Sequence, residues 1–153
     1  MYSIRLTINR TQIVFNINIS KMSVNELRIL PTKDTPEIIL NPDGMIIIDG
    51  RSMIADVNDI TKQLEVWIEE YICDPADITC VDFHLEYLST NNQKFYIMLL
   101  SRLEPIKLMN KKYIINWYYE EGHEDILEKG EYISSVVQIP FNFIMISDPN
   151  ALS

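Results

Sequence analysis

The chain has 153 residues, which is the length of one ordinary domain, so we expect a single hydrophobic core. Apolar residues make up 47% of the sequence and charged residues 23%, a globular composition that argues against a disordered chain. The formal charge of −9 repels phosphate backbones and anionic lipid headgroups, which argues against nucleic acid and acidic membranes as partners.

The two cysteines, Cys73 and Cys80, lie seven residues apart, which fits neither a disulfide framework nor the short paired spacings of zinc sites. We expect both to be reduced thiols in a cytoplasmic protein. No apolar run reaches the roughly 18 residues that a membrane-spanning helix needs, so we expect no membrane anchor.

The N-terminal segment, residues 1–21, alternates apolar and polar residues with the period of strands. The alternating apolar residues are Ile4, Leu6 and Ile8, and then Ile13, Phe15, Ile17 and Ile19. Two interpretations stay open. Either the segment is an added hairpin on a sheet edge, or the native protein starts at Met22 and the segment is an extension. Residues 22–153 are expected to form a single domain.

From Met22 onward, short strands alternate with helices. Turn residues and alternation predict strands at residues 27–30, 37–40, 45–49, 78–88, 113–119 and 143–146, and three- and four-residue spacing predicts helices at 56–71, 92–109 and 125–138. Strand 78–88 is expected to bury Val81, Phe83, Leu85 and Tyr87 and to expose Asp82, His84 and Glu86. The pattern predicts an α/β fold with a mixed β-sheet and helices mainly on one face.

Catalytic motifs are scarce, which favours a binding protein over an enzyme. Four glycines in the whole chain do not build a phosphate-binding loop. His84 with Asp82 and Glu86 offers three metal ligands in principle, but a solvated strand face is the favoured interpretation, so we predict neither metal nor cofactor. The acidic run 120–128 either docks a basic partner or is a solvated loop, and the aromatic segment 117–119 leaves a homodimer open.

Thr90 is the most informative residue, because it lies where a predicted strand passes directly into a predicted helix. Thr90 and Gln93 have the spacing of a capping box, which predicts Thr90 as the N-cap. The same position suits regulation, since a phosphate there would add nearly two negative charges where backbone N–H groups and the helix dipole favour them.

An ordered set of residues then carries a resemblance that extends over nearly all of residues 27–146. The set comprises residues 35–38, Gly44, residues 48–52, Trp67, Tyr71, residues 87–92, Ile115, residues 117–120, Asp125, Glu128, Gly130, Glu131, Pro140 and Phe141. This set resembles the SiaC family of biofilm-regulating phosphoproteins, small bacterial domains with a fold like that of the STAS anti-anti-sigma factors. Thr90 occupies the place of the family's phosphorylated threonine.

The resemblance implies a partner switch without enzymatic activity. A dedicated kinase would phosphorylate Thr90, a PP2C-type phosphatase would remove the phosphate, and the unphosphorylated form would bind and activate a diguanylate cyclase or similar output protein in cyclic di-GMP signalling. Tyr87, Ser89, Asn91 and Asn92 around Thr90 are then the expected partner-binding residues. The alternatives are a non-switching homodimeric scaffold and a small-molecule or metal-binding domain.

The sequence departs from the family pattern in three places. Ser89, Asn91 and Asn92 replace an asparagine and two serines, so Thr90 has lost its hydroxyl neighbours on the C-terminal side. Residues 53–55 replace a segment that commonly carries a proline and a glutamate. The N-terminal extension has no counterpart in short family members.

Overall fold

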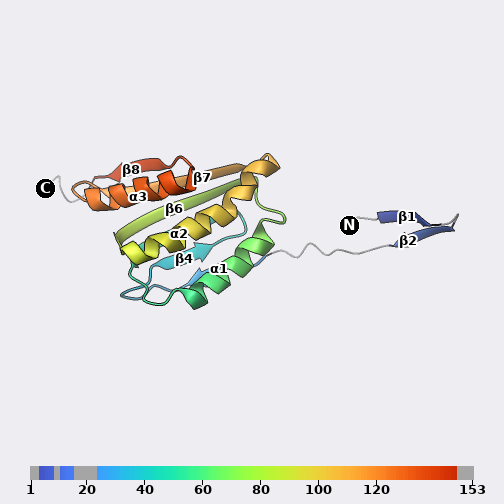
Figure 1. Ribbon diagram of the computed structural model, residues 1–153, viewed down its shortest axis with the longest axis horizontal. Helices are drawn as coiled ribbons and strands as arrows, with labels where there is room; N and C mark the ends of the chain where they lie inside the picture. The colour runs from blue at the N-terminus through green and yellow to red at the C-terminus, as the bar shows by residue number, and fades with distance from the viewer. Residues whose placement is uncertain (1–3, 9–10, 16–23, 148–153) are drawn as a thin grey trace.

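The computed structural model describes residues 4–8, 11–15 and 24–147 (Figure 1). Its first two strands, β1 (Ile4–Ile8) and β2 (Thr11–Phe15), pair antiparallel and form a two-stranded sheet of their own. The sequence left open a hairpin on a sheet edge, and the strand pairs of the described residues do not join β1 or β2 to the larger sheet. Ile17 and Ile19, also predicted as strand residues, lie outside the described residues.

A six-stranded mixed sheet forms the body of the domain. Its strands are hydrogen-bonded in chain order: β3 (Leu27–Ile29), β4 (Glu37–Leu40), β5 (Met45–Ser52), β6 (Ile78–Leu88), β7 (Lys112–Glu120) and β8 (Asn142–Ile146). The pairs β3–β4 and β4–β5 are antiparallel, as short turns between them require, and β5 to β8 run parallel.

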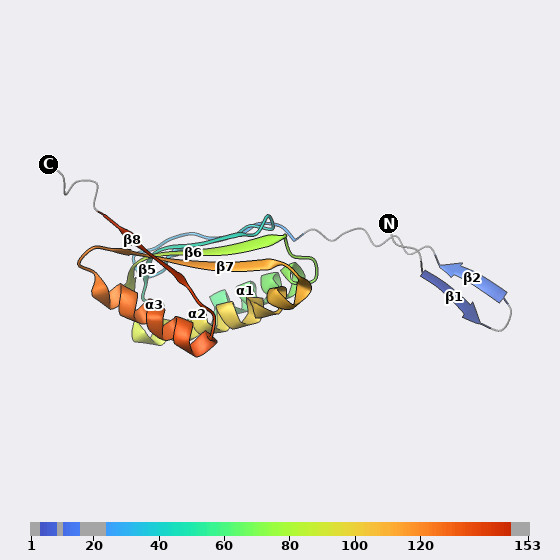
Figure 2. The ribbon, with the colours of Figure 1, turned by 90° about the horizontal axis from the view of Figure 1, so that it is seen from above.

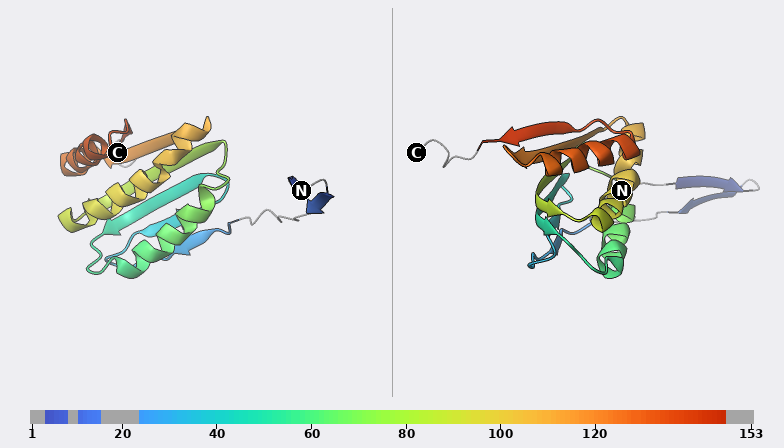
Figure 3. Two further views of the ribbon diagram at one scale, coloured as in Figure 1. Left: turned by 45° about the vertical axis from the view of Figure 1, so that its right-hand side comes forward. Right: turned by 60° about the vertical axis from the view of Figure 1, so that its left-hand side comes forward.

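Three helices cover one face of this sheet, as the edge-on view in Figure 2 shows. They are α1 (Asn58–Tyr71), α2 (Thr90–Leu103) and α3 (Glu124–Val137), and α2 packs between α1 and α3 (Figure 3). The predicted α/β class, with a mixed sheet and helices on one face, is confirmed. No helix among the described residues is long and apolar enough to cross a membrane.

The core lies between the sheet and the helices because alternating strand residues point to the same face. Fully buried residues of the central strands include Ile46, Ile48, Val81, Phe83 and Trp117. Helix α1 meets them with apolar residues at three- and four-residue spacing, of which Leu64, Trp67, Ile68 and Tyr71 are buried.

The second helix is shorter than the predicted 92–109. It ends at Leu103, and a 3₁₀ helix, η1 (Glu104–Met109), follows with Pro105 near its start. Proline has no N–H to donate and its ring clashes with the carbonyl one turn earlier, so the α-helical ladder stops there. Asn110, in the left-handed conformation at φ 57°, then turns the chain into β7.

The parallel strands fix where a functional site can form. Each of β5, β6 and β7 is followed by a helix on the same face, so the N-terminal ends of α1, α2 and α3 gather at the edge of the sheet where these strands end (Figure 1). Open α/β sheets bind their ligands at this edge.

Gly130 sets the approach of α3 to the sheet. A methyl group at this position would lie 2.5 Å from the Trp117 ring, which is fully buried. We expect Gly130→Ala to lower the free energy of unfolding in urea by about 1–3 kcal/mol through overpacking, although alanine is the better helix former. Ser135→Ala, at an exposed position of the same helix, is the control and should change stability by less than about 0.5 kcal/mol. A Gly130→Ala protein as stable as the parent would contradict this packing.

Candidate functional site

The turn between β6 and α2 contains Thr90 and the neighbouring residues that the sequence predicts to bind a partner. Ser89 has an extended backbone, with φ −71° and ψ 150°, and its Oγ accepts a hydrogen bond from the Asn92 backbone N–H at 3.3 Å. Ser89 is therefore the N-cap of α2. The prediction that Thr90 is the N-cap is wrong, because Thr90 is the first residue of the helix itself.

Thr90 is consequently left on the surface. It is exposed, as is Asn91, while Ser89 is half-buried and Leu88 is buried in the core. The backbone N–H of Ser89 donates to the Ser52 carbonyl at 2.9 Å, which extends the pairing of β5 with β6 up to the helix. A hydroxyl group thus projects from a firmly held turn.

Asn92 ties this turn to the end of β5. Its Oδ1 accepts hydrogen bonds from the Ser52 hydroxyl at 2.9 Å and from the Ile54 N–H at 2.8 Å, and its Nδ2 donates to the Ile54 carbonyl at 2.9 Å. The side chain makes these bonds at 1% exposure, where an unpaired amide would be costly. Asn92 was expected to contact a partner, but its side chain is buried and bonded to Ser52 and Ile54. It influences the surface only by holding the turn in place.

Tyr96 completes the buried network. Its hydroxyl donates to the Ser52 Oγ at 2.8 Å, so Ser52 both donates to Asn92 and accepts from Tyr96. Burial raises the pKa of Tyr96, which keeps its hydroxyl protonated as a donor. We call Ser52, Ile54, Asn92 and Tyr96 the asparagine clamp.

Tyr87 lies on the surface beside the turn, with 37% of its area exposed. The alternation of β6 placed it on the buried face, and this prediction is wrong. The strand register shifts at Gly50 and Arg51 of β5, so Glu86 has no partner in the ladder. Such a β-bulge inserts one residue and reverses the alternation beyond it, which exposes both Glu86 and Tyr87 and returns Leu88 to the core.

Two cations lie against the Tyr87 ring. The Arg51 guanidinium carbon is 5.3 Å from the ring centroid, and the Lys129 ammonium nitrogen is 5.2 Å from it. Lys129 also donates a hydrogen bond to the Leu88 carbonyl at 2.6 Å. The surface beside Thr90 therefore holds an aromatic ring with a cation from each of two elements, in a chain whose net charge is negative.

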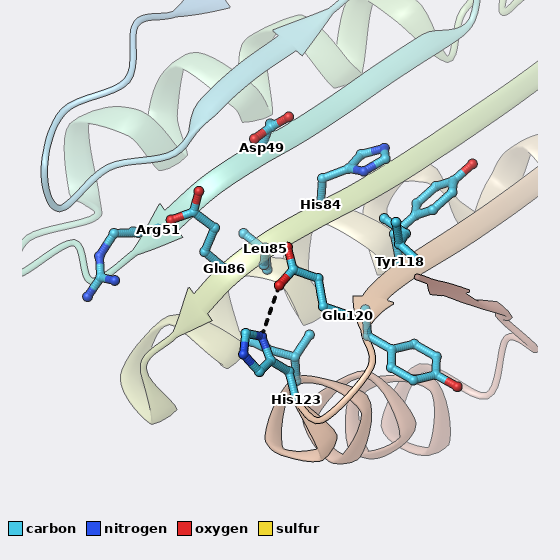
Figure 4. Close-up of a pocket in the computed structure, with 11 residues that line it drawn as sticks. Asp49, Arg51, His84, Leu85, Glu86, Tyr118, Glu120 and His123 are labelled. Atoms are coloured by element: carbon cyan, nitrogen blue, oxygen red, sulfur yellow. Dashed lines mark ion pairs between the residues drawn. The ribbon is translucent and has the colours of Figure 1, made fainter. Parts of the chain in front are cut away.

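A shallow cleft of about 470 Å³ opens on the uncovered face of the sheet at the same edge (Figure 4). His84 of β6 stacks on Tyr118 of β7 there, with ring centroids 4.0 Å apart, and Glu120 lies 3.5 Å from the His123 imidazole. Asp82 accepts a hydrogen bond from the Asn116 amide at 2.8 Å. Among the described residues, no group of three or more His, Cys, Asp and Glu side chains is arranged to hold a metal ion.

The aromatic segment of β7 divides as its alternation predicts. Trp117 is fully buried and donates to the Ile126 carbonyl at 3.0 Å, whereas Tyr118 lies on the uncovered face against His84. The acidic residues Glu124 and Asp125 lie in the first turn of α3, where the helix dipole favours negative charge.

Comparison with known proteins identifies the family. The model of the SiaC family regulatory phosphoproteins matches residues 29–146, which include the clamp and the Thr90 turn. The chain belongs to this SiaC family. A curated relative, an uncharacterized protein of Pseudomonas aeruginosa strain UCBPP-PA14, is 24% identical over 119 residues, which are 77% of this chain and 94% of the relative.

Solved structures of SiaC share the fold. Apo-SiaC from P. aeruginosa is 23% identical and superposes with a TM-score of 0.66, and the match covers 78% of this chain and 97% of SiaC. A chain in the complex of the diguanylate cyclase SiaD with its activator SiaC, from the same organism, is 24% identical with a TM-score of 0.66, over 80% of this chain and 99% of that one. The six-stranded sheet with three helices is thus the SiaC fold.

The two neighbouring hydroxyl residues of the turn can be told apart by stability. We expect Ser89→Ala to lower the free energy of unfolding by about 1 kcal/mol, because it removes the side-chain cap of α2. Thr90→Ala should change it by less than about 0.5 kcal/mol, because the exposed Thr90 does not cap the helix. Urea unfolding of both variants checks this, and a larger loss in Thr90→Ala would return the N-cap to Thr90.

Proposed function

We propose that this chain is a phosphorylation-switched regulatory binding protein, in which the state of Thr90 decides whether a signalling partner binds. The observation that carries the proposal is the exposed Thr90 hydroxyl in the first turn of α2, within a chain of a regulatory phosphoprotein family. The protein acts by binding rather than by catalysis, in the cytoplasm, without a cofactor. A kinase adds the phosphate to Thr90 and a PP2C-type phosphatase removes it.

The asparagine clamp supports a switch that works at the surface. Because Asn92 holds the first turn of α2 to β5 from the buried side, a phosphate on the opposite, exposed side changes charge and shape without disturbing these bonds. The added charge lies at a helix N-terminus, which tolerates it well. The helix therefore stays folded while the surface that a partner meets is altered.

The expected partner is a diguanylate cyclase or a similar output protein, bound when Thr90 is unphosphorylated. SiaC of P. aeruginosa is the activator of the diguanylate cyclase SiaD and is found in complex with it. Tyr87 and Asn91, which are exposed on either side of Thr90, are the side chains we propose to contact the partner. Ser89 and Asn92 contribute by holding the turn in shape.

The test compares Thr90→Ala with Thr90→Asp as baits in native cells, with cross-linking and mass spectrometry of the captured proteins. Thr90→Ala should retain a protein that contains a diguanylate cyclase domain. Thr90→Asp should reduce its recovery at least about tenfold, because the carboxylate imitates part of the phosphate charge and a like-charge or desolvation penalty of about 1.4 kcal/mol already gives that factor.

Ser101→Asp supplies the matched control, since it adds the same charge to an exposed residue near the other end of α2 and should capture the cyclase like the parent. Equal capture by Thr90→Ala and Thr90→Asp would refute the switch. Capture without any cyclase by all four proteins would refute the partner.

A further inference from the structure

Arg51 and Lys129 form an unusual pair in this chain. Acidic residues outnumber basic ones, at 22 to 13, yet two cations lie against Tyr87, an exposed tyrosine three positions before Thr90. Both lie within the roughly 6 Å over which a cation is attracted to an aromatic ring. The Tyr87 ring thus holds both cations beside it through cation–π contacts.

Both cations are held close to the turn by other parts of the fold. Arg51 pairs with Tyr87 in the register of β5 and β6, and the next residue, Ser52, accepts the Ser89 N–H. Lys129 comes from α3 and donates to the carbonyl of Leu88, two residues before Thr90. The two side chains therefore approach the turn from different elements.

Neither cation forms an ion pair with a carboxylate in the described part of the chain. The ion pairs there use Arg28, Lys33, Arg102, Lys107, Lys111 and His123. The hydrogen bonds of Arg51 and Lys129 go instead to the Met53 sulfur at 3.6 Å and to the Leu88 carbonyl. A guanidinium has five N–H donors and an ammonium three, so most of their capacity for an anion is unused.

We propose that Arg51 and Lys129 bind the phosphate of phosphorylated Thr90 within the same molecule, with Tyr87 as their platform. The inference rests on the proposed function, since it requires a phosphate on Thr90. A phosphothreonine carries nearly two negative charges and three strong acceptor oxygens, and its bonds to Arg and Lys are charge-assisted. In the unphosphorylated protein Arg51 is exposed and Lys129 is half-buried, and both keep N–H donors that an acidic group of a partner can bind. The phosphate would release the partner by taking these donors.

The test installs phosphothreonine at position 90 of the full chain during recombinant synthesis by genetic code expansion. In the parent we expect the phosphate to raise Tm by about 6 °C, which corresponds to two charge-assisted hydrogen bonds in a domain of this size. Arg51→Gln and Lys129→Gln should each reduce the gain, and the double variant should lose it. Each variant is compared with its own unphosphorylated form, so its basal stability cancels.

Lys112→Gln is the matched control. It removes one exposed positive charge at the start of β7, whereas the Thr90 turn lies at the end of the sheet where the parallel strands finish, so this variant should keep the whole gain in Tm. A gain that survives in the double variant would assign the phosphate to the helix N-terminus alone and overturn the proposal. A phosphate that lowers Tm in the parent would overturn it as well. If the double variant does not fold, Arg51→Gln decides, since it removes no hydrogen bond to the backbone.

The installed phosphate separates this inference from the proposed function. Loss of the gain in the variants supports the cation pair whether or not a kinase reaches Thr90 in cells. Cells that leave Thr90 unmodified would refute the proposed function, but the Tm measurements would still show whether Arg51 and Lys129 bind the phosphate.

Discussion

The buried amide of Asn92 is the constraint on which the site depends. It joins two segments that lie about 40 positions apart in the sequence, the end of β5 and the first turn of α2, through hydrogen bonds on both its oxygen and its nitrogen. Removing one partner of a buried hydrogen bond leaves the other partner unsatisfied, which is costly. The hydrogen bonds of Asn92 are therefore kept or lost together. Because the clamp uses the inward side of the turn, Ser89 can cap the helix and Thr90 is left to face solvent.

The sheet topology explains why charge and hydroxyl groups meet there. Parallel strands followed by helices on one face bring the ends of β5 and β6 together with the starts of the helices. The bulge opposite Gly50 then rotates Tyr87 out of the core, and α3 supplies Lys129 from a third element. Two cations on an aromatic ring thus adjoin the Thr90 turn in a protein whose net charge is strongly negative, and their N–H donors can bind an anion.

Local sequence patterns predicted the elements well and their junctions less well. The alternation of β6 was sufficient as far as Leu85 and failed at Tyr87, because the bulge depends on the register with β5, which a strand's own sequence does not contain. The cap was misassigned by one residue for a similar reason. Gln93 gives Thr90 the local spacing of a capping box, whereas the bonds of Asn92 to Ser52 and Ile54, far away in the sequence, hold the turn in which Ser89 caps the helix. The early end of α2 could have been predicted from the sequence, because Pro105 disfavours an α-helix that continues through it. The sequence did not predict Arg51 and Lys129 as site residues, because they are far apart in the sequence and meet at Tyr87 only in the folded chain.

The central claim is that Thr90 carries the regulatory phosphate. Peptide mass spectrometry of the full chain purified from its native cells, across growth conditions, tests it most directly. The account predicts a single added phosphate, located on Thr90 and present in some conditions but not in others. A chain that is unmodified in every condition, or phosphorylated only at another residue, would contradict it and leave Thr90 as the first residue of a helix in a constitutive binding protein.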